Sequence, residues 1–280
     1  MKIKRILAII LVLLLVTGLC LVNAFLVNPK QVTIREEIWT SDKFREDIDG
    51  WNVAFFSDLC YGSYSGIEHA EKAQKLINDF QPEVVLFGGD LLLQGSELSE
   101  EEEEALISCL KGMSARYGKY AVLGDRDLSS EEQKEKVTSI LQAAGFRILS
   151  GNSGRVYAGK DSYINIVGID PMSEEQCSSA FEGVNTLNYT IVLTHCPDIF
   201  YSLPKDKCDS VLSGHSLGGQ VYLPVISFFN RDEGCRNYYR GKITLGNTVM
   251  DITNGLGMAK EKVRFLADSE VVFYQLKRKP

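Results

Sequence analysis

Short apolar runs that end on a residue able to bind a metal recur along this chain. Runs of about 4–8 residues rich in Val, Ile, Leu and Phe are typical of buried strands. At the carboxyl ends of such strands, α/β sheets gather their ligands and catalytic groups. Three Asp and two His are therefore expected to meet in one crevice. The runs are Val53–Asp58, Val84–Asp90, Tyr120–Asp125, Ile191–His195 and Ser210–His215.

The first half of the chain alternates strand and helix patterns. Gln31–Ile38 partly alternates apolar with polar residues and is typical of an edge strand. Apolar residues recur at helical spacing over Gly66–Phe80, and Pro82 follows, so a helix is expected there with His69 on its surface. With the strand Val84–Phe87, this helix completes a βαβ unit.

Two further helices have recognisable starts. The acidic run Glu100–Glu104 follows Ser99, a good N-cap, and favours a helix start over a cation site. Ser129–Glu132 has the capping-box pattern and starts a helix that is expected to end near Gly145.

The second half is rich in short strands and predicts a second sheet packed on the first, with helices outside. The expected strands, beginning with the last one of the first half, are Tyr120–Leu123, Arg147–Leu149, Arg155–Ala158, Tyr163–Ile169, Thr190–Thr194, Ser210–Ser213, Lys242–Leu245, Met250–Thr253 and Glu270–Gln275.

The N-terminus has the pattern of a membrane anchor. Met1–Arg5 carries three positive charges, and Ile6–Val27 carries none. At about 1.5 Å per residue this stretch spans about 33 Å, enough for a bilayer core of about 30 Å. The basic flank predicts a single-pass protein of the cell membrane, with residues 1–29 as flank and anchor and residues 30–280 as one domain outside the cytoplasm. Signal cleavage after Ala24, giving a secreted protein, is the alternative, whereas bulky Leu19 disfavours lipidation of Cys20.

Composition is that of an ordinary globular protein, at 45% hydrophobic and 24% charged residues. Residues 30–280 keep 27 of the 30 basic and all 37 acidic residues, a net charge of −10. So acidic a domain is a poor partner for nucleic acid. The cysteines outside the anchor match no CxxC zinc pattern, and their pairing stays open.

Each strand-end Asp alone is typical of a turn, but the glycines before Asp90, Asp125 and His215 strengthen the pattern. In order, the blocks resemble those of the calcineurin-like metallophosphoesterases, particularly their membrane-associated bacterial branch. The family's blocks are Asp-x-His, Gly-Asp, Gly-Asn-His-Asp, a lone His after a strand, and Gly-His-x-His. The corresponding stretches here are 58–60, 89–91, 124–127, 194–198 and 214–220, and 239–241 and 254–257 are similar to the branch's closing strands and Gly-rich turn. The resemblance implies an α/β fold, a four-layer α/β/β/α sandwich of two mixed sheets flanked by helices.

The resemblance also implies two metals bridged by one carboxylate, here Asp90. The second metal's other ligands match Asp125, which replaces the family's Asn, with His195 and His215. We therefore expect one divalent metal, Mn, Fe or Zn.

The first metal's ligands would be Asp58, Cys60 and Asp90, with Leu217 where the family has its last His. Leu217 cannot ligate. Cys60 either ligates as a thiolate, which would favour zinc, or is only a small tolerated side chain. Binding of an additional metal at this first-metal site is therefore doubtful.

Arg126 stands where the family has its general-acid histidine, and Asp127 matches the residue that orients that histidine. A guanidinium can clamp a phosphate but cannot supply a proton near neutral pH. Two functions are therefore possible. The first is hydrolysis of a phosphate ester, weakened by the loss of three site histidines. The second is binding without catalysis, by a descendant that keeps the fold in order to bind a phosphorylated ligand, a metal or a partner.

Overall fold

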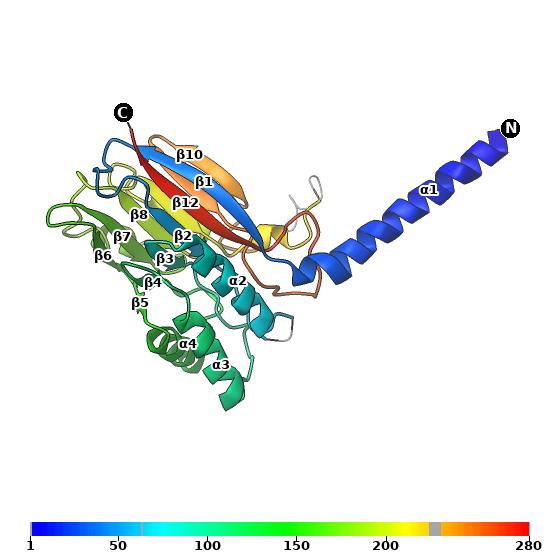
Figure 1. The fold of residues 1–280 in the computed structure, drawn as a ribbon, viewed down its shortest axis with the longest axis horizontal. Coiled ribbons are helices and arrows are strands. Elements are labelled where there is room, and N and C mark those ends of the chain that lie inside the picture. The colour runs from blue at the N-terminus through cyan, green and yellow to red at the C-terminus, as the bar shows by residue number, and fades with distance from the viewer. Residues whose placement is uncertain (1, 63, 224–230, 280) are drawn as a thin grey trace.

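Two six-stranded mixed sheets pack face to face in the computed structural model, which describes residues 2–62, 64–223 and 231–279 (Figure 1). The first sheet has the order β1-β12-β2-β3-β4-β5. Its strands are β1 (Thr33–Ser41), β12 (Glu270–Arg278), β2 (Asn52–Phe56), β3 (Val84–Phe87), β4 (Lys119–Ala121) and β5 (Phe146–Ile148).

The second sheet has the order β10-β11-β9-β8-β7-β6. Its strands are β10 (Gly241–Leu245), β11 (Thr248–Ile252), β9 (Ser210–Ser213), β8 (Thr190–Thr194), β7 (Tyr163–Ile169) and β6 (Asn152–Tyr157). All expected strands are present, with ends shifted by at most three residues.

Parallel pairing brings the strand ends of interest together. In the first sheet β2, β3, β4 and β5 run parallel, with Phe56 level with Phe87. In the second sheet β7, β8, β9 and β11 run parallel. The loops that follow β2, β3 and β4 therefore leave one edge of the first sheet, and those after β8 and β9 leave one edge of the second.

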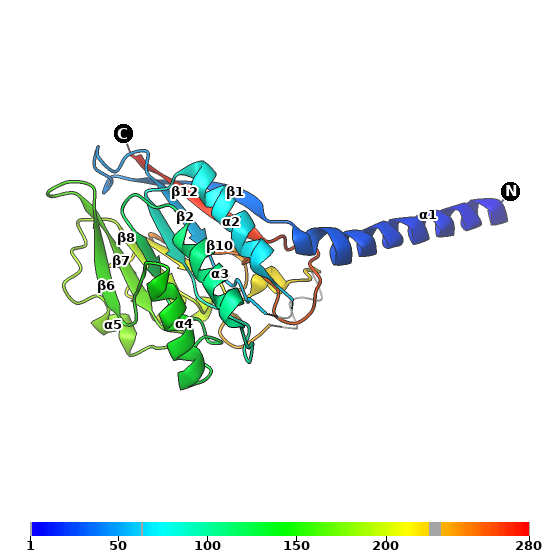
Figure 2. The same ribbon diagram turned by 60° about the horizontal axis from the view of Figure 1, so that its bottom comes forward.

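Helices cover the outer face of each sheet, which confirms the predicted four layers. Figure 2 shows α2 (Ile67–Phe80), α3 (Glu100–Lys111) and α4 (Glu131–Ala143) over the first sheet. Over the second sheet, the described residues place the short helices α5 (Gln176–Ser179) and η3 (Pro197–Ser202), through a cluster that includes Phe181 and Phe200. The fourth layer is therefore thin. Between the sheets lies a separate apolar core.

The two predicted helix starts are present, and one is displaced by a residue. Ser99 caps α3 in a full capping box with Glu102, so the acidic run does begin a helix. For α4 the cap is Ser130, whose hydroxyl accepts from the Gln133 N–H at 3.1 Å, and not Ser129. Since both serines precede acidic residues, the sequence pattern alone does not show which of the two serines is the N-cap.

The N-terminal segment leaves the domain as a long helix, α1 (Lys2–Val22), which Figure 1 shows projecting away from the sheets. It continues through a π turn, η1 (Asn23–Val27), and a 3₁₀ turn, η2 (Asn28–Lys30). Among the described residues it is the one helix long and apolar enough to cross a membrane, and signal sequences near an N-terminus share that property. A last short turn, η4 (Leu217–Gly219), follows β9.

The prediction that His69 lies on the surface was wrong. Its side chain is 2% exposed, and its Nε2 lies 2.7 Å from the Pro29 carbonyl oxygen at the base of the N-terminal segment. The Lys72 ammonium donates to the Lys30 carbonyl one turn further along α2. The helix face that carries His69 is covered by the anchor's base, which sequence periodicity could not reveal.

The cap assignment of α4 can be tested with adjacent variants. Ser130→Ala removes an acceptor from a helix N–H and is expected to lower the free energy of unfolding by about 1 kcal/mol. Ser129→Ala, at an exposed neighbour, is the matched control and should change it by less than about 0.5 kcal/mol. Urea unfolding followed by circular dichroism gives both values, and equal losses would contradict the assignment.

Candidate metal centre

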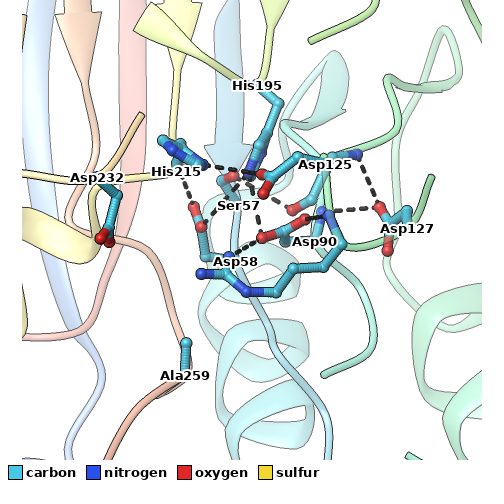
Figure 3. Close-up of polar contacts among 12 residues, drawn as sticks. Ser57, Asp58, Asp90, Asp125, Asp127, His195, His215, Asp232 and Ala259 are labelled. Carbon is cyan, nitrogen blue, oxygen red and sulfur yellow. Dashed lines mark hydrogen bonds and ion pairs between the residues drawn. The ribbon is translucent and has the colours of Figure 1, made fainter. Parts of the chain in front are cut away.

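Five side chains from both sheets meet at the predicted edge. Asp58 follows β2, Asp90 follows β3 and Asp125 follows β4, while His195 and His215 directly follow the ends of β8 and β9. Figure 3 shows the three carboxylates and the two imidazoles pointing toward one another. All but Asp125 are buried, and 44% of the Asp125 side chain is exposed. Asp125 therefore lies at the mouth of the site.

Two of the glycines that precede these residues are required by close approach. A Cβ atom on Gly124 would lie 2.0 Å from Oδ1 of Asp90, and one on Gly214 would lie 2.3 Å from Oδ2 of Asp58. Any larger residue would push one loop off a neighbouring carboxylate. The physical reason for the Gly-Asp and Gly-His pairs is thus contact between loops as well as a sharp turn.

The backbone of these loops is held in the left-handed region without glycine. Asp58, Asp90 and His215 have φ angles of 54°, 58° and 71°, and Cys60 and Leu217 have 45° and 52°. Such conformations cost about 1–3 kcal/mol each and persist only where the surroundings enforce them. Their concentration around one crevice is typical of a functional site.

Both histidines are oriented as metal ligands are. Nδ1 of His195 lies 2.7 Å from the Gly88 carbonyl oxygen, and Nε2 of His215 lies 2.6 Å from that of Glu233. A carbonyl only accepts, so each of these nitrogens carries the proton. The opposite nitrogens face the carboxylates: Nε2 of His195 lies 3.1 Å from Oδ1 of Asp125, and Nδ1 of His215 lies 2.9 Å from the same oxygen. A backbone bond that fixes the far nitrogen and frees the near one is the usual support of a ligating histidine.

The carboxylates and imidazoles of the site perturb one another's protonation. Burial acts to lower the pKa of His195, but the Asp90 and Asp58 carboxylates outweigh it and raise that pKa well above its usual value. For His215, the hydrogen bond to Asp125 likewise outweighs burial and raises the pKa. In turn the two histidines hold the pKa of Asp125 below its usual range against the opposing effect of burial.

The second-metal residues fit a divalent cation. Ligand atoms of Asp90, Asp125, His195 and His215 all lie within 4.8 Å of one another. Ligands about 2.1 Å from one metal lie at most about 4.2 Å apart, so small movements complete the shell. In its neutral form, His195 would present the lone pair of Nε2 to a metal between the Asp90 and Asp125 carboxylates, whose oxygens lie 3.2 and 3.1 Å from that nitrogen.

The residues at the first-metal position do not form a complete set of metal ligands. Asp58, Cys60 and Asp90 do approach one another, but Leu217, at the position of the family's last His, is a buried apolar side chain without a ligand atom. Burial, reinforced by the Asp90 and Asp58 carboxylates, raises the pKa of the Cys60 thiol well above its usual value. Ligation by Cys60 would therefore have to overcome the cost of forming a thiolate beside two carboxylates.

Arg126 and Asp127 take different partners from those the sequence suggested. The Arg126 guanidinium contacts Oδ2 of Asp90, and its backbone N–H donates to Oδ1 at 3.1 Å. Asp127 is fully buried and accepts from three backbone N–H groups, those of Asp90, Leu91 and Gly124, at 2.8–2.9 Å. The two side chains therefore bond to different groups, and Asp127 joins the loops that carry Asp90 and Asp125.

Two supporting side chains had no signal in the sequence. Arg264 is fully buried, and its guanidinium donates to backbone carbonyls of the Leu217 loop and of the Gly-rich turn. Asp198 accepts from three successive backbone N–H groups, those of Arg236, Asn237 and Tyr238, and so holds the loop whose Glu233 carbonyl orients His215. An isolated charge in a loop gives no indication of such backbone partners.

Metal binding is expected to release protons. The pKa values of His195 and His215 are raised, which favours the protonated rings, while a ligating imidazole is neutral. Mn²⁺ should therefore displace protons from the site, and its affinity should rise with pH. Titration calorimetry in two buffers of different ionisation enthalpy measures the number of protons released. No proton release would contradict this assignment, and His195→Ala should abolish the binding heat.

Comparison with known proteins agrees with the geometry. The chain is 24% identical over 252 residues to the metallophosphoesterase YkuE of Bacillus subtilis, which covers 89% of this chain and 87% of that one. It is 24% identical over 215 residues to phosphodiesterase YaeI of Escherichia coli, covering 76% and 78%. With UDP-2,3-diacylglucosamine pyrophosphatase LpxG of Chlamydia trachomatis it shares 23% over 300 residues, covering 87% and 89%. No protein-family model matches the chain. Similarity over most of both chains, joined to this two-sheet fold, supports the resemblance to the calcineurin-like metallophosphoesterases that the sequence blocks indicated.

Proposed function

We propose that this protein is a membrane-anchored phosphoesterase that works with one divalent metal, held by Asp90, Asp125, His195 and His215. Residues 1–29 serve as the anchor and residues 30–280 as the phosphoesterase domain. The observation that carries the proposal is the orientation of the two histidines. Each donates its far N–H to a backbone carbonyl, which directs the other nitrogen at shared carboxylates.

The residues around this site determine what chemistry is possible. A bound divalent metal would polarise the phosphoryl oxygen and lower the pKa of water. Half-exposed Asp125 marks the side from which a phosphate ester enters. Arg126, the residue in the general acid's place, keeps its proton at any physiological pH. The leaving group must therefore depart without a proton from this side chain, so esters with acidic leaving groups are the favoured substrates.

A second candidate is a binding protein without turnover. The specific observation in its favour is that Arg126 already contacts the carboxylate that would bridge two metals, while Leu217 fills the position of another ligand. Both changes affect positions that would take part in hydrolysis. In contrast, Asp127 and the loop glycines still make the contacts that shape the site. Such a protein would hold a phosphorylated ligand at the same metal.

The anchor lies close to the site, which favours a substrate at the bilayer surface. The Arg264 backbone N–H donates to the Ala24 carbonyl at 3.0 Å, and the Arg264 guanidinium donates to Leu217, two residues after His215. One residue thus joins the helix base to the metal-site loop. The similar LpxG is named for a pyrophosphatase acting on a diacylated glucosamine nucleotide, and a phosphate ester of an envelope component is the substrate class we propose.

Hydrolysis of aryl phosphodiesters tests the proposal. The full-length protein in detergent with Mn²⁺ should cleave bis-p-nitrophenyl phosphate faster than His195→Ala does, and the rate should fall steeply as the leaving group becomes less acidic. Cys60→His, Arg126→His and Leu217→His together should flatten that dependence and raise the rate on poor leaving groups by about 10²–10⁴-fold. A wild-type rate equal to the His195→Ala blank, with metal bound, would replace hydrolysis by the binding function.

Membrane attachment has a separate test. Leu13→Arg with Leu14→Arg places two charges at the middle of α1, each costing about 2.5–3.5 kcal/mol on insertion. The wild type should stay in the membrane pellet after an alkaline wash, and protease added to intact protoplasts should digest its domain. The double variant should leave the pellet, while Leu13→Ile with Leu14→Ile should not. A wild type that is shortened by cleavage after Ala24 and found in the medium would favour the secreted alternative.

A further inference from the structure

We propose that the Arg126 guanidinium replaces the first metal, so that Asp90 bridges one divalent cation and one guanidinium. This inference rests on the proposed function for the identity of the remaining metal site. It assigns Arg126 a role that differs from clamping substrate phosphate: it is the fixed positive charge of the site.

The contacts of Asp90 carry the proposal. Oδ2 of Asp90 lies 3.2 Å from Nε2 of His195 and also contacts the Arg126 guanidinium. Oδ1 accepts the Arg126 backbone N–H at 3.1 Å. One carboxylate thus faces a metal-ligating histidine on one side and a cation on the other. A bridging carboxylate in a two-metal site has the same arrangement, with metal ions on both sides.

The surroundings of this guanidinium suit a hydrogen-bond donor better than a metal. The Arg126 side chain is 16% exposed, and the carboxylates of Asp90, Asp125 and Asp58 all act on its charge. Oδ1 of Asp58 is buried without a hydrogen-bond partner in the metal-free structure, which leaves an acceptor in the same pocket. A guanidinium needs acceptors, whereas a metal needs lone-pair donors such as imidazole.

The other two substitutions follow from the same exchange. Where a metal requires two histidines, an arginine needs only room and carboxylates, so Cys60 and Leu217 can stand in their places. Both side chains are buried, at 0% and 4% exposure. Three changes that look like separate losses therefore describe one replacement of a cation by a side chain.

The charges of the site agree with one metal only. Asp58, Asp90 and Asp125 together carry three negative charges when ionised, and one divalent cation with Arg126 carries three positive ones. Asp127 and Arg264, which bond to backbone groups around the site, carry opposite charges. Buried charges are tolerated only when they are paired, and a second divalent cation beside Arg126 would be uncompensated.

Metal counting on the full-length protein in detergent tests the proposal. After dialysis against Co²⁺, the wild type should retain one cobalt per chain, measured by mass spectrometry of the metal, without thiolate-to-cobalt absorption. Cys60→His with Leu217→His restores the two missing ligands but keeps Arg126, and this double variant should still retain one. Adding Arg126→Gln to the double variant should raise the count to two. Arg126→Lys in the same background keeps the positive charge and should retain one.

Each outcome decides the matter. Two metals in the wild type or in the double variant, or one in the Arg126→Gln triple variant with its melting curve intact, would overturn the role of Arg126 and leave the proposed function standing. No metal in the wild type would overturn the proposed function itself. One metal in the wild type, the double variant and the Arg126→Lys triple variant, with two in the Arg126→Gln triple variant, would support the replacement.

Discussion

The site depends on the buried carboxylate of Asp127, which holds two loops of the first sheet against each other. Its two oxygens accept from the backbone N–H groups of Asp90, Leu91 and Gly124. Burial and the nearby Asp90 carboxylate raise the pKa of Asp127 to about 7, while the backbone donors favour its ionised form. Because the bonds run to backbone atoms, they fix where Asp90 and Asp125 leave their strands. The ligand geometry follows from that constraint.

The two sheets contribute unequally to the crevice. The first sheet supplies all three carboxylates, which sit in tight turns after parallel strands. The second supplies both imidazoles, and each is oriented by a carbonyl from elsewhere in the chain, Gly88 for His195 and Glu233 for His215. The site therefore forms only when the sheets are packed, and the close passage of Gly214 beside Asp58 shows how little space separates them.

The backbone contacts that support the site are present, but some of the side chains at the ligand positions differ from those of the family. The half of the crevice centred on Asp125 keeps donors suited to a divalent cation, while the half centred on Cys60 offers a guanidinium, a thiol and an apolar side chain. Under the proposed function, such a site would bind a phosphate ester with less positive charge than two metals provide, so slower hydrolysis or binding alone is expected.

The sequence by itself determined the elements and the ligand set. Apolar runs ending on Asp or His, three of them after glycine, predicted both sheets and the five residues that meet at their edge, because strand periodicity and turn chemistry are local properties. What only the tertiary structure decided is which partner each polar side chain takes. His69 is covered by the anchor, Arg126 contacts Asp90 while Asp127 bonds to backbone, and Arg264 joins Ala24 to the metal-site loop. These partners lie up to about 240 residues away along the chain, and burial and hydrogen bonding between such segments depend on packing that no local pattern encodes.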